Sequence, residues 1–247
     1  MNRSIAYISL LLLTVFSLSA TDYETLRVKA GRFYRYEEWS SALAMYKLML
    51  DRRPDVADTY SHAIVAASMD TVNHPDEPAL LLRQSMNALV PLDSVYDGVQ
   101  RLAFEQGNAG LYERFLEDVG NRYSWLRRNI DGRLLAYYTW RRNADGMVEY
   151  ALRMLQGMPG NIEYLTALAD GYFGLGENRL AVDIYNRILA LDPDNYHALL
   201  TLGNYYDNAS RQDRFNQEAS VLARQYLTRA NSLRATPYVT QLLDRQM

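Results

Sequence analysis

Residues 162–195 read IEYLTALADGYFGLGENRLAVDIYNRILALDPDN, and this stretch decides the fold of the 247-residue chain. Apolar residues recur at intervals of three and four in two blocks, 164–172 and 180–191, which is the spacing of one buried helix face. Glycines at 174 and 176 separate the blocks, and glycine allows a tight reversal between helices. Pro193 ends the second block because it has no amide hydrogen to donate. The stretch therefore predicts a helix, a turn, a second helix and a stop.

The same stretch resembles a tetratricopeptide repeat (TPR), a helix pair of about 34 residues. The positions that carry the resemblance are the small and aromatic residues of the two helices, the turn glycine and the final proline: Leu168, Ala169, Tyr172, Gly176, Ala181, Tyr185 and Pro193. A small residue on one helix lets an aromatic ring of the other approach closely. Ala169 and Ala181 are therefore predicted to lie where the two helices cross most tightly. The resemblance implies an all-α fold, an α-solenoid of antiparallel helix pairs wound as a right-handed superhelix.

Two more copies follow the same register. Residues 23–56 repeat it, with Ala42, Tyr46 and Pro54 at the second-helix alanine, aromatic and terminating proline. Residues 196–235 repeat it with the second-helix pattern eight residues late, which predicts a loop insertion within 207–214.

The rest of the chain keeps helical periodicity without the repeat's characteristic residues. We interpret residues 57–160 as divergent helical hairpins of the same solenoid, because neither a linker nor a strand pattern interrupts them. Pro237 is expected to begin a short closing helix over 238–245 that covers the last repeat. Residues 21–247 are thus predicted to form one domain of about six helical hairpins with a C-terminal capping helix.

Residues 1–20 have the layout of a secretory signal peptide. A single positive charge at Arg3 precedes an apolar stretch over 5–16, and small residues up to Ala20 follow it. The stretch is shorter than the roughly 20 residues that span a bilayer. We therefore expect export to the periplasm or outside the cell, without stable membrane insertion once the signal is removed.

Composition excludes several classes of function. The chain has no cysteine, so it has no disulfide scaffold and no thiolate metal site. Its formal charge of -3 gives no broad electrostatic reason to bind nucleic acid. The three histidines, His62, His74 and His197, fall in different hairpins and predict no metal site. No nucleophile, phosphate-binding or dinucleotide motif is present, so we expect no catalytic residue, no cofactor and no enzymatic activity.

In TPR proteins the first helix of each pair lines a concave groove, and ligand contacts come from fixed positions on it. The resemblance places these positions in the three good copies at Arg27, Gly31 and Tyr34, at Thr166, Asp170 and Phe173, and at Leu200, Asn204 and Asp207. The base and asparagine that chaperone-binding relatives use to clamp a dicarboxylate do not occur together on one helix. This mixed polar and aromatic groove favours a peptide or protein segment as the ligand.

A second candidate surface is a cluster of arginines and aromatic residues at 122–142. Guanidinium groups bind oxyanions and rings stack on flat ligands, so the cluster suits carboxylates, phosphates or sugar faces. The residues of the possible patch are Arg128, Arg133, Tyr137, Trp140 and Arg141, with Trp125 nearby. The alternative interpretation is that Tyr138 joins Leu126, Ile130 and Leu134 on a core stripe while the arginines coat the outside.

The sequence thus predicts an exported, non-enzymatic scaffold that binds another protein or a peptide segment in the cell envelope, in assembly or maintenance of an envelope complex. The first alternative is a helical glycan-binding module that uses Trp125, Trp140 and neighbouring tyrosines. The second is an enzyme built on a helical solenoid.

Overall fold

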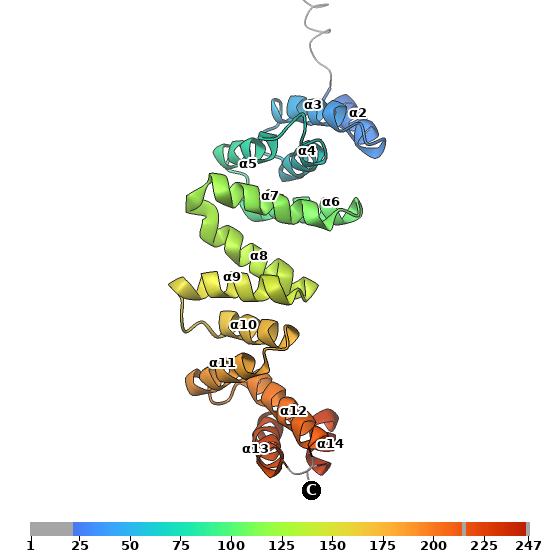
Figure 1. The fold of residues 1–247 in the computed structure, drawn as a ribbon. Helices are drawn as coiled ribbons and strands as arrows, with labels where there is room; N and C mark the ends of the chain where they lie inside the picture. Colours follow the sequence, from blue (N-terminus) through green and yellow to red (C-terminus); the bar gives the residue numbers. More distant parts are fainter. Residues whose placement is uncertain (1–21, 214–215, 246–247) are drawn as a thin grey trace, which may run out of the picture. The chain divides into compact units, whose positions relative to one another are not determined.

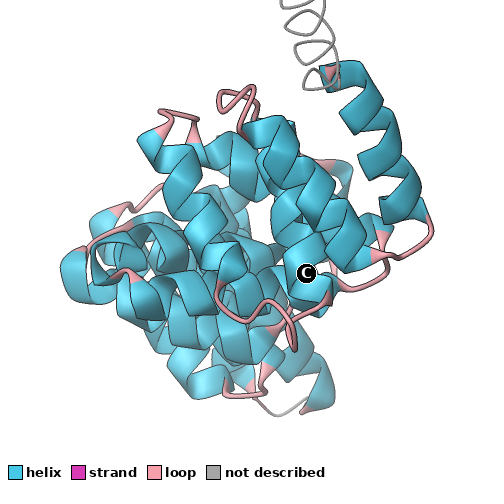
Figure 2. Ribbon diagram, turned by 90° about the horizontal axis from the view of Figure 1, so that it is seen from above, coloured by secondary structure: helices cyan, strands magenta, loops and turns pink. Residues whose placement is uncertain are grey.

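The structure is a computed structural model that describes residues 22–213 and 216–245. Over these residues it contains helices and no strand (Figures 1 and 2). The predicted signal peptide lies outside the described residues. The chain divides into two compact units, Met1–Ser124 and Trp125–Met247.

Each unit is built from consecutive helix pairs. The helices of the first unit are α2 (Tyr23–Arg35), α3 (Trp39–Leu50), α4 (Ala57–Met69), α5 (Glu77–Asn87), α6 (Leu92–Glu105) and α7 (Ala109–Arg122). The short 3-10 helix η1 (Ser124–Leu126) lies at the division between the units. Those of the second unit are α8 (Arg127–Arg141), α9 (Ala144–Gly157), α10 (Ile162–Gly174), α11 (Asn178–Leu191), α12 (Tyr196–Gln212), α13 (Gln217–Leu233) and α14 (Pro237–Asp244).

Each odd-numbered helix from α3 to α13 packs against the helix before it, which gives six hairpins and a final short helix. The prediction of an all-α, TPR-like fold with six hairpins and a cap is confirmed. The divergent stretch 57–160 also forms hairpins, although it lacks the repeat's characteristic residues. That the two units form a single superhelical domain stays a prediction.

Local sequence signals set the helix ends of the second unit. The side chains of Asn143, Asn161, Asn195 and Asn216 accept hydrogen bonds from amides three residues later, at distances of 2.9 to 3.1 Å. Such N-caps satisfy amides that have no partner within the helix. The turn between α10 and α11 passes through Gly176, whose φ of 79° favours glycine. Pro193 follows α11, as expected.

The small residues that the repeat pattern places at the helix crossings are buried. Ala169 and Ala181 are fully buried, and Tyr185 packs beside them with no exposed surface. Ala42 and Tyr46 are buried in the same way in the first repeat. The volume match between alanine and the aromatic ring keeps each pair close-packed.

The predicted loop insertion in the last repeat is wrong. Residues 207–212 continue α12, and α12 and α13 each reach 17 residues. The buried Asp207 carboxylate is paired one turn later with Arg211 at 3.0 Å, which favours a continued helix. The extra residues therefore lengthen the hairpin rather than its connection.

The closing helix is present. In α14, Val239 and Leu242 are buried and pack on Leu227 of α13, so they cover the apolar face that the last repeat would otherwise expose. In the described part of the chain, no helix combines the length and the hydrophobicity needed to span a bilayer.

Candidate functional site

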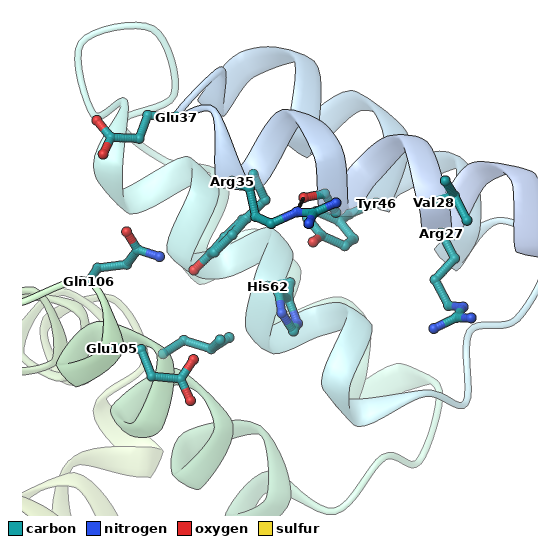
Figure 3. Close-up of a pocket in the computed structure, with 11 residues that line it drawn as sticks. Arg27, Val28, Arg35, Glu37, Tyr46, His62, Glu105 and Gln106 are labelled. Carbon is teal, nitrogen blue, oxygen red and sulfur yellow. Dashed lines mark hydrogen bonds between the residues drawn. The ribbon is translucent and has the colours of Figure 1, made fainter.

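The first unit contains a concave pocket of about 570 Å³ on its first helices. Side chains from α2, α4 and α6 line it, among them Arg27, Tyr34, Arg35, His62, Glu105 and Gln106 (Figure 3). Gly31 also lines it, and no side chain fills the space in front of its backbone. The predicted groove positions of the first repeat, Arg27, Gly31 and Tyr34, therefore share one cavity.

An aromatic cluster forms one wall of this pocket. The ring of His62 lies 5.2 Å from that of Tyr34 and 5.3 Å from that of Tyr46, between centroids. The two tyrosine rings meet edge to face at 6.2 Å, and Trp39 packs on the other edge of Tyr34 at 5.2 Å. These contacts hold three ring planes in fixed orientations at the cavity wall.

A chain of charged groups borders the histidine. His62 Nδ1 lies 2.9 Å from the carbonyl oxygen of Asp58 and 3.3 Å from its carboxylate. Arg101 pairs with Asp58 at 3.1 Å and with Glu105 at 3.0 Å. The bond to His62 and the charge of Arg101 hold the pKa of Asp58 below its ordinary value. His62 and Glu105 thus reach the cavity with partners already in place.

Tyr34 is more enclosed than a typical groove residue. Only 7% of its surface is exposed, and its hydroxyl has no hydrogen-bond partner of acceptable geometry among the described residues. Burial raises the pKa of this hydroxyl well above its ordinary value, and the nearby side chain of Gln106 opposes that rise. The hydroxyl is therefore protonated at neutral pH and remains a donor.

The second unit has its own concave pocket, of about 410 Å³, between the first helices α8 and α10. Its lining includes the apolar Leu135 and Ala167, the hydroxyl of Thr139 and the carboxylates of Glu163 and Asp170. Thr166, a predicted groove residue, also lines it but donates its hydroxyl to the carbonyl of Ile162 in its own helix.

Asp170 is the centre of a polar cluster in this groove. It accepts a hydrogen bond from the hydroxyl of Tyr185 on α11 and lies 3.5 Å from Nε2 of His197 on α12. The Tyr185 hydroxyl is also 3.1 Å from His197 Nε2. The bond to Asp170 raises the pKa of His197, whereas burial opposes the rise. The pKa of the Tyr185 hydroxyl is raised mainly by burial and, to a lesser extent, by its hydrogen bond to Asp170.

The other predicted groove residues of the second unit have structural partners. Phe173 stacks on Tyr185, with 5.8 Å between the ring centroids. Leu200 packs against the buried cluster of Leu227, Val239 and Leu242. Asn204 accepts a hydrogen bond of 2.9 Å from Tyr238. Asp207 is a correction: only 1% of its side chain is exposed, so it is buried and does not lie on a groove surface.

The arginine and aromatic cluster does not form one surface. Tyr137 and Tyr138 are buried, so Tyr137 is corrected from a member of the possible patch to a core residue, and the core stripe of Tyr138 with Leu126, Ile130 and Leu134 is confirmed. Trp125 and Trp140 are 65% and 64% exposed, but 15 residues of mostly helical rise place them roughly 20 Å apart. They cannot form one stacking platform for a sugar ring.

The arginines of that stretch point to different partners. Arg122, in the first unit, pairs with Asp76 at 2.6 Å and with Asp118 at 2.7 Å. In the second unit, Arg128 lies beside Gly157, and the Arg141 guanidinium lies 6.0 Å from the Tyr137 ring. Arg133 is half-buried.

Metal ligands do not converge in the described ranges: no group of three or more histidine and carboxylate side chains is placed to hold an ion. His74, whose loop carries several acidic residues, lies 3.1 Å from the Ser40 hydroxyl, and that hydroxyl donates to Asp70 at 2.5 Å. This contact ties the α4–α5 loop to the start of α3.

Sequence reasoning missed the part that His62, Arg35 and His197 play at the grooves, because it weighed the histidines only as metal ligands. A signal was available. The spacing from Tyr34 to Tyr46 equals the spacing from Phe173 to Tyr185, and in each case a histidine follows on the next first helix.

Several solved structures of repeat proteins are similar to this chain. The C-terminal part of a TPR repeat-containing protein from Cytophaga hutchinsonii is 13% identical, with 84% of this chain and 78% of that chain covered, at a TM-score of 0.48. A TPR repeats protein from Bacteroides fragilis is 17% identical, with 92% and 98% covered, at 0.39. The TPR2AB domain of yeast Sti1, solved in a complex with pHSP90, is 10% identical, with 91% and 98% covered, at 0.36.

No family model matches the sequence, and no curated protein matches it significantly. The assignment of a TPR-like fold therefore depends on the repeat register and on the helix hairpins described above.

Proposed function

We propose that this chain is a non-enzymatic scaffold that binds extended segments of another protein in the grooves on its first helices. The observation that carries the proposal is the construction of the two grooves. Each has a cavity of several hundred cubic ångströms, lined by first helices and bordered by fixed aromatic rings and polar groups. Extended peptides bind surfaces of this kind because side-chain pockets and spaced polar groups meet alternate residues.

The proposal includes a location. The charge, apolar stretch and small residues of positions 1–20 support export, and the partner would then be a protein of the cell envelope or the outside. Subcellular fractionation combined with mass spectrometry of the N-terminus tests this part. A mature chain that begins near residue 21 and leaves the cytoplasm is expected, and an intact Met1 in the cytoplasm would refute it.

Site-specific photocrosslinking in the native cell tests the groove. A photoreactive amino acid at Val28, which is 65% exposed and lines the first pocket, is expected to crosslink a defined partner. The same amino acid at Leu48, which is exposed on α3 of the same unit and does not line that pocket, serves as the control. Equal crosslinking from both positions, or none from Val28, would contradict binding in the groove.

The glycan-binding alternative was suggested by paired tryptophans, and that feature is lost because Trp125 lies in η1, before α8 begins, whereas Trp140 lies near the end of α8. A glycan pull-down that is abolished by Trp140→Ala would restore it.

A further inference from the structure

Two repeats of this chain differ at two positions of the first helix, and these differences indicate what the first groove binds. Counted from the start of each repeat, at Tyr23 and at Ile162, Gly31 occupies the position of Asp170 and Tyr46 that of Tyr185. Four residues further along the first helix of each repeat, the glycine is in the second unit and the charged residue is in the first, because Arg35 occupies the position of Gly174. The second unit thus has an acid followed by a glycine, and the first has a glycine followed by a base.

In the second unit the acid completes a hydrogen-bonded cluster. The carboxylate of Asp170 accepts a hydrogen bond from the Tyr185 hydroxyl and lies 3.5 Å from the imidazole of His197. The tyrosine of the second helix and the histidine of the next first helix are therefore both satisfied by one carboxylate.

In the first unit the Gly31 position has no carboxylate, and the position of His197 is occupied by Asp58, whereas His62 lies one turn further along α4 and contacts that aspartate at 3.3 Å. A Cβ built on Gly31 would meet no atom within 4 Å, and the space belongs to the pocket. Tyr46 and His62 still face each other there, with ring centroids 5.3 Å apart. Over the described residues, the Tyr46 hydroxyl has no acceptor to match Asp170.

Two further donors point to the same ligand chemistry. Arg35 has no carboxylate partner in the described part of the chain and donates only to the carbonyl of Gly31, at 3.2 Å, which keeps its guanidinium beside the open space (Figure 3). The Tyr34 hydroxyl, on a side chain more than nine-tenths buried at the pocket wall, is an unpartnered donor. Of these two donors only the Tyr34 hydroxyl is buried, and a buried donor without an acceptor costs free energy that a bound acceptor would relieve.

We propose that the first groove binds the acidic side chain of an extended peptide, and that the bound carboxylate takes the place that Asp170 fills in the second unit. The carboxylate would accept hydrogen bonds from Tyr46 and Arg35. This inference rests on the proposed function and adds the chemistry of the recognised residue to it.

The other charges at the pocket are compatible with this ligand. Arg27 is held by Glu24 at 2.7 Å, whereas Arg101 is shared between Glu105 at 3.0 Å and Asp58 at 3.1 Å, so those three side chains carry one net negative charge. Glu37 lines the outer end of the pocket and lies apart from Arg35 and Tyr46 in Figure 3. Next to Gly31 itself the charged side chain is that of Arg35, which donates to the Gly31 carbonyl and has no carboxylate partner among the described residues.

The test is a binding assay with the purified chain and defined peptide pools. The probes are fluorescent heptapeptides with capped ends and a fixed central residue, Glu, Gln or Lys, in a mixed apolar background. A fourth pool has a central Gln and a free C-terminal carboxylate. We expect the Glu pool to bind at least about tenfold more tightly than the Gln pool, equivalent to ~1.4 kcal/mol.

Gly31→Asp is the decisive variant, because it supplies from the chain itself the carboxylate that the ligand would bring. It should remove the preference for Glu while the melting temperature stays at or above that of the wild type, since the added side chain enters open space. Gly160→Asp is the matched control, because Gly160 is also open and lies in the second unit. Tyr46→Phe and Arg35→Gln should each weaken the Glu pool several-fold.

The possible outcomes separate the inference from the proposed function. Equal binding of the Glu and Gln pools, or a Glu preference that survives Gly31→Asp, would overturn the inference and leave groove binding intact. Preference for the free C-terminal pool, lost in Gly31→Asp, would replace the side chain with a chain terminus as the source of the carboxylate. If no pool binds, the inference fails, and the proposed function fails with it only if Val28 also gives no crosslink.

Discussion

The substitution Gly98→Ala gives the sharpest test of how the first unit is packed. Gly98 lies on α6 where that helix crosses α4, and a Cβ at this position would lie 2.2 Å from Oγ and 2.8 Å from Cβ of Ser61. Ser61 is fully buried, and its hydroxyl can donate to the carbonyl of Val95 on α6 or to that of Ala57 in its own helix, each at 3.1 Å. The serine cannot move aside without losing the contact with Val95 or separating the two helices.

The expected magnitude follows from three contributions. Alanine is favoured over glycine in a helix by about 1 kcal/mol, which would stabilise the variant. Forcing a methyl group into a filled crossing costs ~1–3 kcal/mol. Loss of the buried hydrogen bond of Ser61 costs a further ~1–3 kcal/mol. We therefore expect a net loss of about 1–5 kcal/mol in the free energy of unfolding of the first unit.

The matched control is the same substitution in another helix of the same unit. Gly31 lies within α2, and a Cβ there would meet nothing within 4 Å. Gly31→Ala should keep only the helix-propensity gain and stabilise the unit by up to about 1 kcal/mol. The two variants differ only in packing, so their difference measures the crossing of α4 and α6.

Urea unfolding followed by circular dichroism and by hydrogen exchange of the α4 and α6 amides provides the measurement. The midpoints should rank Gly31→Ala above the wild type and the wild type above Gly98→Ala. The double variant Ser61→Gly/Gly98→Ala moves the small residue to the other helix and should regain much of the loss relative to Ser61→Gly alone. A midpoint of Gly98→Ala at or above the wild type would show that the helices do not approach as described.

Three other predictions concern the second unit. The pKa of His197 is raised in the folded chain, so the contribution of this histidine to stability is complete below about pH 6.5 and is lost as the pH rises through the folded pKa. Asp170→Asn should return the pKa of His197 toward its ordinary value in an NMR titration. An unchanged titration would contradict the pairing of His197 with Asp170. Asn195→Ala removes the N-cap of α12 and should cost about 1 kcal/mol in urea unfolding, whereas an unchanged midpoint would mean that the cap contributes nothing. Truncation after Thr236 exposes the α13 face that Val239 and Leu242 cover, and should lower the free energy of unfolding by at most ~3–6 kcal/mol. A urea unfolding transition that stays fully cooperative with an unchanged midpoint would argue against a capping role for α14.

The sequence predicted the fold well where the signals are local. The glycines near 176 and the proline at 193 set the turn and the stop of one hairpin, and the alternation of small and aromatic residues set its crossing. It failed at residues 207–214, where an extra stretch could either loop out or lengthen two helices. The choice depended on a pair formed one turn apart, Asp207 with Arg211, and on burial of that carboxylate.

The candidate sites were less accessible from the sequence. The family pattern placed Arg27, Gly31 and Tyr34 on one face of α2, and the structure brings them to one cavity. It could not supply His62, because that residue reaches the cavity from the following hairpin, 28 positions beyond Tyr34. It also misjudged Tyr137, since an aromatic residue in an arginine-rich helix can face either side and only packing decides which.

What the sequence determined by itself is therefore the class of fold, the number of hairpins and the positions of the tight crossings. Each depends on interactions between residues close in the chain: helix periodicity, caps, turn glycines and the volume match within one hairpin. Only the tertiary structure decided which polar groups share a groove and which of them lack a partner. Asp170 and Gly31 occupy the same position of the repeat. Their difference becomes informative only in the tertiary structure, because the tyrosine and histidine next to each position come from neighbouring helices.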